Sequence, residues 1–170
     1  MSKQELMDKA REFAAYAEKN YSNCAQCVLG AVKHALGEDG PITDDIFKAA
    51  TGFAGGVGRS GSACGAVTGA VLAVSAYTGR DWADFKDKSK GGAAYTLSGE
   101  VVARFRDEYG SQECRGIHQK LFGRSFNIAD PEEFKAFVDA GGYKDENCPR
   151  VCGDGAAWAV EALYDEGYIK

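Results

Sequence analysis

The chain has 170 residues, of which 45% are hydrophobic and 26% charged, as expected for one globular domain with a hydrophobic core. Its 20 basic and 25 acidic side chains give a net charge of −5, the wrong sign for neutralising phosphates, so we expect no nucleic-acid partner. The nearly uncharged stretch from Gly61 to Gly79 is interrupted by glycines and hydroxyl side chains, and it predicts a buried helix rather than a membrane span.

The first residues are charged and lack the apolar segment of a secretory signal, which indicates a cytoplasmic protein. Apolar residues at three- and four-residue steps predict an amphipathic helix over residues 3–20. Ser22 and Asn23 supply capping side chains for a second helix, which we expect to begin at Cys24 and to close at Gly37. Thr43 caps a shorter helix through Ala50.

Five glycines in residues 52–61 predict an irregular loop. Helices are predicted beyond it over residues 62–79, from Asp81 or Ser89 through Tyr109, after Ser111, from Asp130 and from Asn147. No segment has the alternation typical of a strand. The predicted fold is all-α: a single-domain bundle of about six to eight helices over residues 1–170, with a glycine-rich loop before the helix that follows Cys64.

Six cysteines in a cytoplasmic chain favour metal binding or redox chemistry over structural disulfides. Four of them lie in the first turn of a predicted helix, each preceded by a capping side chain: Cys24 after Asn23, Cys64 after Ser62, Cys114 after Ser111, and Cys148 after Asn147. A helix N-terminus carries partial positive charge, so we expect all four to favour the thiolate. If they converge, they form a cage suited to an iron–sulfur cluster or a tetrathiolate zinc ion; otherwise they are unrelated structural cysteines.

The remaining two cysteines lie one helical turn deeper, because Cys27 follows Cys24 by three residues and Cys152 follows Cys148 by four. We interpret each as a reserve partner of the neighbouring cysteine. The alternative, above all for Cys152, is a buried apolar thiol. The first pair matches the C-x-x-C of thiol–disulfide proteins, but the βαβ context that would make this match specific is missing.

Residues 56–61 match the dinucleotide fingerprint G-x-G-x-x-G, yet no strand is predicted on either side. We expect these glycines to permit a tight path that delivers Cys64 to the interior. Gly65 and Gly69, four residues apart, are expected to let a neighbouring helix approach closely.

His118 follows Cys114 by four residues and is a candidate metal ligand, although we expect a partly exposed helical histidine without a special role. The acidic side chains are expected on the solvent faces of helices, and no catalytic pair of carboxylates stands out. Arg59 and Arg115 are expected to add positive charge near Cys64 and Cys114.

Several of these segments together resemble the C_GCAxxG_C_C family of redox-active proteins: Asn23 to Gln26, the glycine run Gly55 to Arg59, the hexapeptide Cys64 to Gly69, Gly110 to Arg115, and Cys148. The resemblance spans residues 24–148, although this chain reads Cys64-Gly65 where the family label writes Gly-Cys. It implies a redox role with Cys24, Cys64, Cys114 and Cys148 as the signature positions. A similar cysteine region in split-Soret cytochromes, which carry an iron–sulfur centre, implies a 2Fe–2S site.

The leading hypothesis is a cytoplasmic protein that binds a 2Fe–2S cluster through these four cysteines and passes single electrons to a partner protein. The second is a thiol–disulfide enzyme without metal, in which Cys64 attacks and Cys24 or Cys27 resolves. The third is a structural zinc protein that uses the same four cysteines, but their spacings of 40, 50 and 34 residues are far longer than those of zinc ribbons. Whether the chain is an oxidoreductase or an electron carrier stays open, as does its oligomeric state, a homodimer included.

Overall fold

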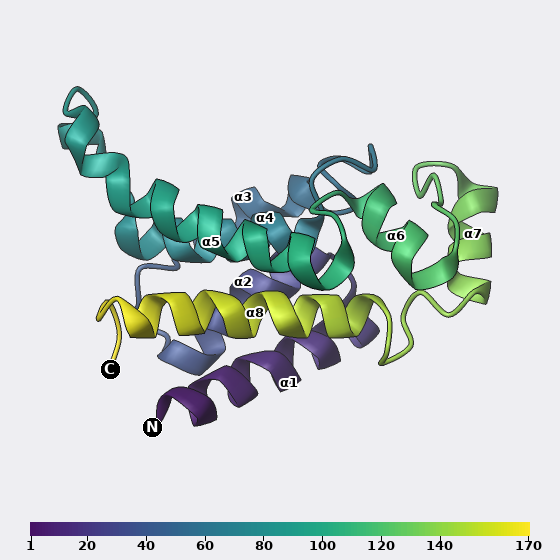
Figure 1. Cartoon of the computed structure of the whole chain (residues 1–170), viewed down its shortest axis with the longest axis horizontal. Coiled ribbons are helices and arrows are strands. Elements are labelled where there is room, and N and C mark those ends of the chain that lie inside the picture. The colour runs from purple at the N-terminus through teal and green to yellow at the C-terminus, as the bar shows by residue number, and fades with distance from the viewer.

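The computed structural model describes all 170 residues and confirms the all-α prediction, with eight α-helices, three short 3-10 helices and no strands (Figure 1). The α-helices are α1 (Lys3–Tyr21), α2 (Cys24–Leu36), α3 (Asp44–Ala49), α4 (Gly65–Thr78), α5 (Gly92–Tyr109), α6 (Cys114–Phe122), α7 (Pro131–Asp139) and α8 (Cys148–Asp165). The 3-10 helices are η1 (Ala50–Phe53), η2 (Trp82–Asp84) and η3 (Lys88–Gly91).

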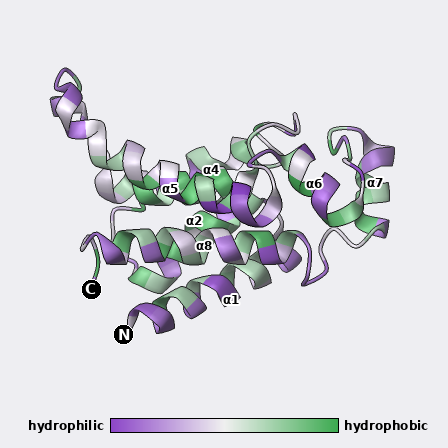
Figure 2. Cartoon of the chain, viewed as in Figure 1, coloured by the Kyte–Doolittle hydropathy of each residue, from purple (hydrophilic) through white to green (hydrophobic).

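Helix α8 forms the centre of the bundle, with α1 on one side and α5 on the other, and it also packs against α2 and α4 (Figure 1). Its small residues are buried along almost the whole helix, which allows several neighbours to approach it at once. Figure 2 shows α2 and α4 largely in the green of hydrophobic residues, whereas purple is frequent on α1 and on the second half of α5. The core therefore lies between α2, α4 and α8, and α1 and α5 cover it with their apolar faces.

The approach of α2 to α4 depends on the two glycines singled out in the sequence. A methyl group added to Gly69 would lie 2.5 Å from the carbonyl oxygen of Ala25, so a larger residue does not fit there. Gly65 is similarly close to Cys24. The expectation that these glycines permit close helix packing is confirmed.

The glycine-rich segment is irregular, as predicted, and has an unusual backbone. Five consecutive residues, Gly55 to Arg59, have positive φ angles, although Val57 and Arg59 are not glycines. The N–H groups of Gly61 and Ser62 donate to the carbonyl oxygens of Gly55 and Gly56 and close the turn. No strand precedes or follows it, so the match to the dinucleotide fingerprint lacks its structural context.

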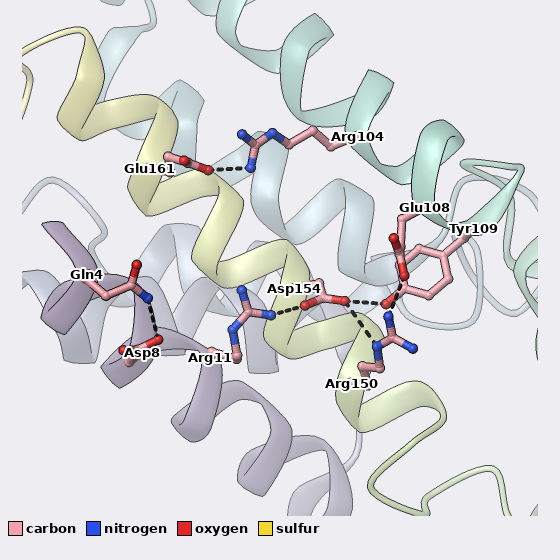
Figure 3. A network of polar contacts seen from close by, with 9 residues as sticks. All are labelled: Gln4, Asp8, Arg11, Arg104, Glu108, Tyr109, Arg150, Asp154 and Glu161. Carbon is pink, nitrogen blue, oxygen red and sulfur yellow. Dashed lines mark hydrogen bonds and ion pairs between the residues drawn. The ribbon is translucent and has the colours of Figure 1, made fainter.

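A buried polar network fixes the N-terminal half of α8 against α1 and α5 (Figure 3). The carboxylate of Asp154 on α8 pairs with Arg11 of α1, accepts a hydrogen bond of 2.5 Å from the Tyr109 hydroxyl of α5, and lies 3.6 Å from Arg150. Asp154 is buried, so the expectation that acidic side chains all lie on solvent faces was wrong here. The network holds the helix that begins at Cys148 in a defined position.

Helices α6 and α7 lie at one end of the bundle, and η2, η3 and the first turns of α5 project from the opposite end (Figure 1). None of the helices combines the length and the apolarity needed to cross a bilayer. The end formed by α6 and α7 is where the starts of α2, α4 and α8 also meet.

Candidate functional site

A cavity of about 260 Å³ lies where the N-terminal ends of α2, α4, α6 and α8 come together. All four cysteines of the predicted cage line this cavity: Cys24, Cys64, Cys114 and Cys148. All six cysteines of the chain are free. Residues as far apart in sequence as 24 and 148 therefore meet in one place.

Each of the four cysteines stands at a helix start. Cys24, Cys114 and Cys148 are the first residues of α2, α6 and α8, and Cys64 is the residue directly before α4. A two-sided backbone link joins two of them, because the N–H of Cys64 donates to Gln112 (2.9 Å) and the N–H of Cys114 donates to Ser62 (2.7 Å). This link fixes the start of α4 beside the start of α6.

The predicted side-chain caps are correct at only one of the four cysteines. The side chain of Asn23 accepts the N–H of Gln26 and caps α2 as expected. At α4 the cap position is taken by Cys64 itself rather than by Ser62, and at α6 it is taken by Glu113 while Ser111 accepts the N–H of Glu113. Asn147 precedes α8 but its side chain donates to the carbonyl of Gly141 and caps nothing.

The expectation that the four thiols favour the thiolate was also wrong. Burial raises the pKa of both Cys64 and Cys114 to about 12, and it raises the pKa of Cys24 and Cys148 well above the ordinary value. The negative charges of Glu18 and of neighbouring cysteines add to this effect, and backbone N–H groups oppose it only in part at Cys24 and Cys64. The thiols are therefore protonated at neutral pH unless a cation joins them.

A fifth cysteine, Cys152, lines the same cavity. Cys152 is on the second turn of α8, and its sulfur lies 4.0 Å from the carbonyl oxygen of Cys24. Cys27 is buried but does not line the cavity, and its thiol donates to the carbonyl of Ser22 at 3.0 Å. The structure therefore brings Cys24 and Cys64 to one cavity, whereas Cys27 does not line it.

Glu18 is a buried acid at the cavity, contrary to the expectation that acidic side chains lie on solvent faces. Only 5% of it is exposed, and its Oε2 atom has no hydrogen-bond partner. Burial raises the pKa of this carboxyl to about 7, against the opposing effect of hydrogen bonds with Cys27 and Cys152. The signal was present in the sequence, because Glu18 follows Ala14 by one helical turn on the apolar face of α1.

His118 is buried rather than partly exposed as expected, with 2% of its surface accessible. It stacks on Phe137 and contacts the edges of Phe122 and Phe126. Its Nε2 atom lies 3.7 Å from the Cys114 sulfur, and burial lowers the pKa of the ring to about 4. A neutral imidazole therefore faces one of the four thiols from an aromatic pocket.

The metal-ligating side chains do not close around a single point. No three His, Cys, Asp or Glu side chains are arranged to hold one metal ion. A two-iron cluster spreads its protein ligands over two metal ions and two sulfides, whereas zinc needs all of its ligands in one coordination sphere. The four thiols therefore line a cavity without a common centre.

The comparisons with known proteins agree with the motif. The family described as "Putative redox-active protein (C_GCAxxG_C_C)" matches residues 22–162, and the chain belongs to this family. An uncharacterized protein of Archaeoglobus fulgidus is 27% identical over 121 residues, which cover 69% of this chain and 79% of that protein. No solved structure matches the chain.

Proposed function

We propose that this chain is a cytoplasmic redox protein that binds a 2Fe–2S cluster through Cys24, Cys64, Cys114 and Cys148 and transfers single electrons to and from a partner protein. One observation carries the proposal: four buried thiols from four separate helix starts line one cavity. Membership of a family described as redox-active supports the general class.

The electrostatics around the four sulfurs favour a cationic occupant. Burial and the neighbouring sulfurs raise the pKa of all four thiols, and Arg59 is the one basic side chain at the cavity wall. Iron would supply the missing positive charge and hold the sulfurs as thiolates. Once bound, the cluster would supply one-electron chemistry.

The protein's own groups would tune that chemistry. The backbone N–H groups of Gly55 and Ala25 lie near the Cys24 sulfur, and those of Ala66 and Val67 lie near the Cys64 sulfur. Donors near the sulfurs stabilise the more negative, reduced state and therefore raise the reduction potential. The apolar walls formed by Ile117, Val151 and Phe137 would limit the access of water.

The two alternative functions receive less support from the same cavity. A thiol–disulfide enzyme needs a low-pKa nucleophile, and burial raises the pKa of Cys64 and Cys24 instead. A structural zinc ion would have to be held by cysteines 40, 50 and 34 residues apart, which are far longer spacings than those of zinc ribbons.

The proposal is tested by comparing two buried cysteines, Cys64 inside the cavity and Cys27 outside it. Both cysteine-to-serine variants are purified without oxygen, and their folding is checked by circular dichroism. We expect Cys64→Ser to lose iron and the visible absorption at about 400–600 nm that such clusters give, while Cys27→Ser keeps both. A Cys64→Ser protein with the full chromophore would contradict the ligand assignment.

A further inference from the structure

Arg59 differs from every other arginine of the chain. The sequence has eight arginines, and seven of them make a side-chain hydrogen bond, an ion pair or a contact with an aromatic ring. The side chain of Arg59 makes none of these, although it lines the cavity. An unpaired guanidinium at a cavity wall is available to a ligand.

The backbone around Arg59 is held in a conformation that a side-chain-bearing residue rarely adopts. Its φ angle is 66°, and the loop is fixed by a hydrogen bond of 3.1 Å from the Arg59 N–H to the carbonyl of Ala54. Gly55, which begins the same turn, packs tightly on Ile128: a methyl group added to Gly55 would lie 2.6 Å from the Ile128 side chain. Strained backbone of this kind is concentrated at functional sites, and here it places a cation beside the cavity.

The cavity wall next to Arg59 is apolar and partly aromatic. Thirteen of the nineteen lining residues are hydrophobic, and Arg59 is the one cation among them. Phe134 on α7 is 40% exposed, and Ile128 and Tyr143 also line the cavity. The one acid of the lining, Glu18, contacts Cys27 and Cys152. Apart from it, the wall is largely apolar with one charged group, which is the usual composition of a small-molecule site.

We propose that the solvent-exposed end of this cavity, away from the four sulfurs, binds a small organic anion with a flat apolar body, whose acidic group pairs with the exposed Arg59 while its ring packs on Phe134 and Ile128. The inference deepens the proposed function, because a ring bound there lies in the same cavity as the cysteines proposed to hold the cluster. The binding itself depends on Arg59 and the apolar wall rather than on the metal.

The test uses two probes of the same shape that differ in charge, 2-naphthoate and 2-naphthamide, titrated calorimetrically into the anaerobically purified protein. We expect the carboxylate to bind at one site per chain and more tightly than the amide. Arg59→Gln weakens binding of 2-naphthoate by about tenfold and leaves the amide unchanged, because only the carboxylate loses a charge-assisted hydrogen bond. Phe134→Ala weakens both probes, because it removes the ring contact that they share.

The matched control is Arg80→Gln, which removes one positive charge beyond the far end of α4 and leaves binding of both probes unchanged. Equal affinity of the wild-type protein for the two probes, or no effect of Arg59→Gln, would overturn the inference. The proposed function is judged separately by iron content. A chain without iron that binds 2-naphthoate through Arg59 contradicts the cluster alone, and a chain with iron in which Arg59→Gln binds normally contradicts the anion site alone.

Discussion

The sulfur of Cys24 lies directly against the backbone of Gly65, so that a methyl group on Gly65 would stand 2.2 Å from that sulfur. Gly65 follows Cys64, another of the four cavity cysteines, in the chain. The absence of a side chain at Gly65 therefore allows thiols from α2 and α4 to share one cavity. This contact gives a physical reason for the glycine that follows the cysteine in the hexapeptide Cys64 to Gly69.

Gly65→Ala tests this relationship. We expect the added methyl to push the Cys24 side chain away, to lower the free energy of unfolding by about 1 to 3 kcal/mol, and to reduce the iron content of the protein. Chemical denaturation and metal analysis of the same preparation measure both effects.

The control for this variant is Gly99→Ala, because Gly99 lies within α5 and an added methyl would meet no atom within 4 Å. It should raise the free energy of unfolding by about 0.5 to 1 kcal/mol, since alanine is the better helix former. A Gly65→Ala protein with normal stability and full iron content would show that the contact with Cys24 is unimportant.

Glu18 makes the stability of the metal-free, reduced protein depend on pH. Burial raises the pKa of its carboxyl from 4.5 to about 7, so the folded state binds more protons than the unfolded state between these values. Ionisation of Glu18 therefore lowers the stability as the pH rises from about 4.5 through 7. Glu18→Gln removes this cost, and the variant should be more stable than the wild type by about 3 kcal/mol at pH 8, with little difference at pH 4.

Urea denaturation across this pH range, with chelator and reductant present, measures the Glu18 effect. The control is Glu12→Gln, which replaces an exposed acid of the same helix and removes no buried charge, so it should not reproduce the stabilisation of Glu18→Gln at pH 8. A Glu18→Gln difference that does not change between pH 4 and pH 8 would refute the assignment.

The network around Asp154 is expected to be important for stability. Asp154→Asn leaves Arg11 without its buried partner and weakens the bond to Tyr109, so we expect a loss of about 3 kcal/mol in the free energy of unfolding. Asp139→Asn, which breaks an exposed ion pair with Lys135 one turn away on α7, should cost less than about 0.5 kcal/mol. Equal losses in the two variants would mean that burial of Asp154 adds nothing.

The sequence was sufficient to predict the helices and the positions of the four cysteines within them. Apolar spacing, the glycine-rich break and caps such as Asn23 and Asp130 are local signals, and each corresponds to an observed helix boundary or loop. The cap at α4 was missed because a cysteine, Cys64, occupies the position usually held by an oxygen-bearing side chain.

The composition of the site was harder to predict, because it depends on contacts between distant segments. Spacing alone puts Glu18 on the apolar face of α1, but only the packing of α1 against α8 shows that this carboxyl meets Cys152. The burial of His118 likewise depends on Phe137 of α7, nineteen positions along the chain. The raised pKa of each thiol has the same origin, because helix starts stabilise a thiolate locally whereas burial is set by the whole fold.

The most direct test of the central proposal is the iron and acid-labile sulfide content of the wild-type protein, purified without oxygen from a cytoplasmic preparation. A 2Fe–2S cluster held by the four cavity cysteines predicts about two irons and two sulfides per chain, with visible absorption that Cys64→Ser abolishes. A colourless protein that contains neither iron nor sulfide, even after attempted reconstitution of the cluster, would contradict the proposal.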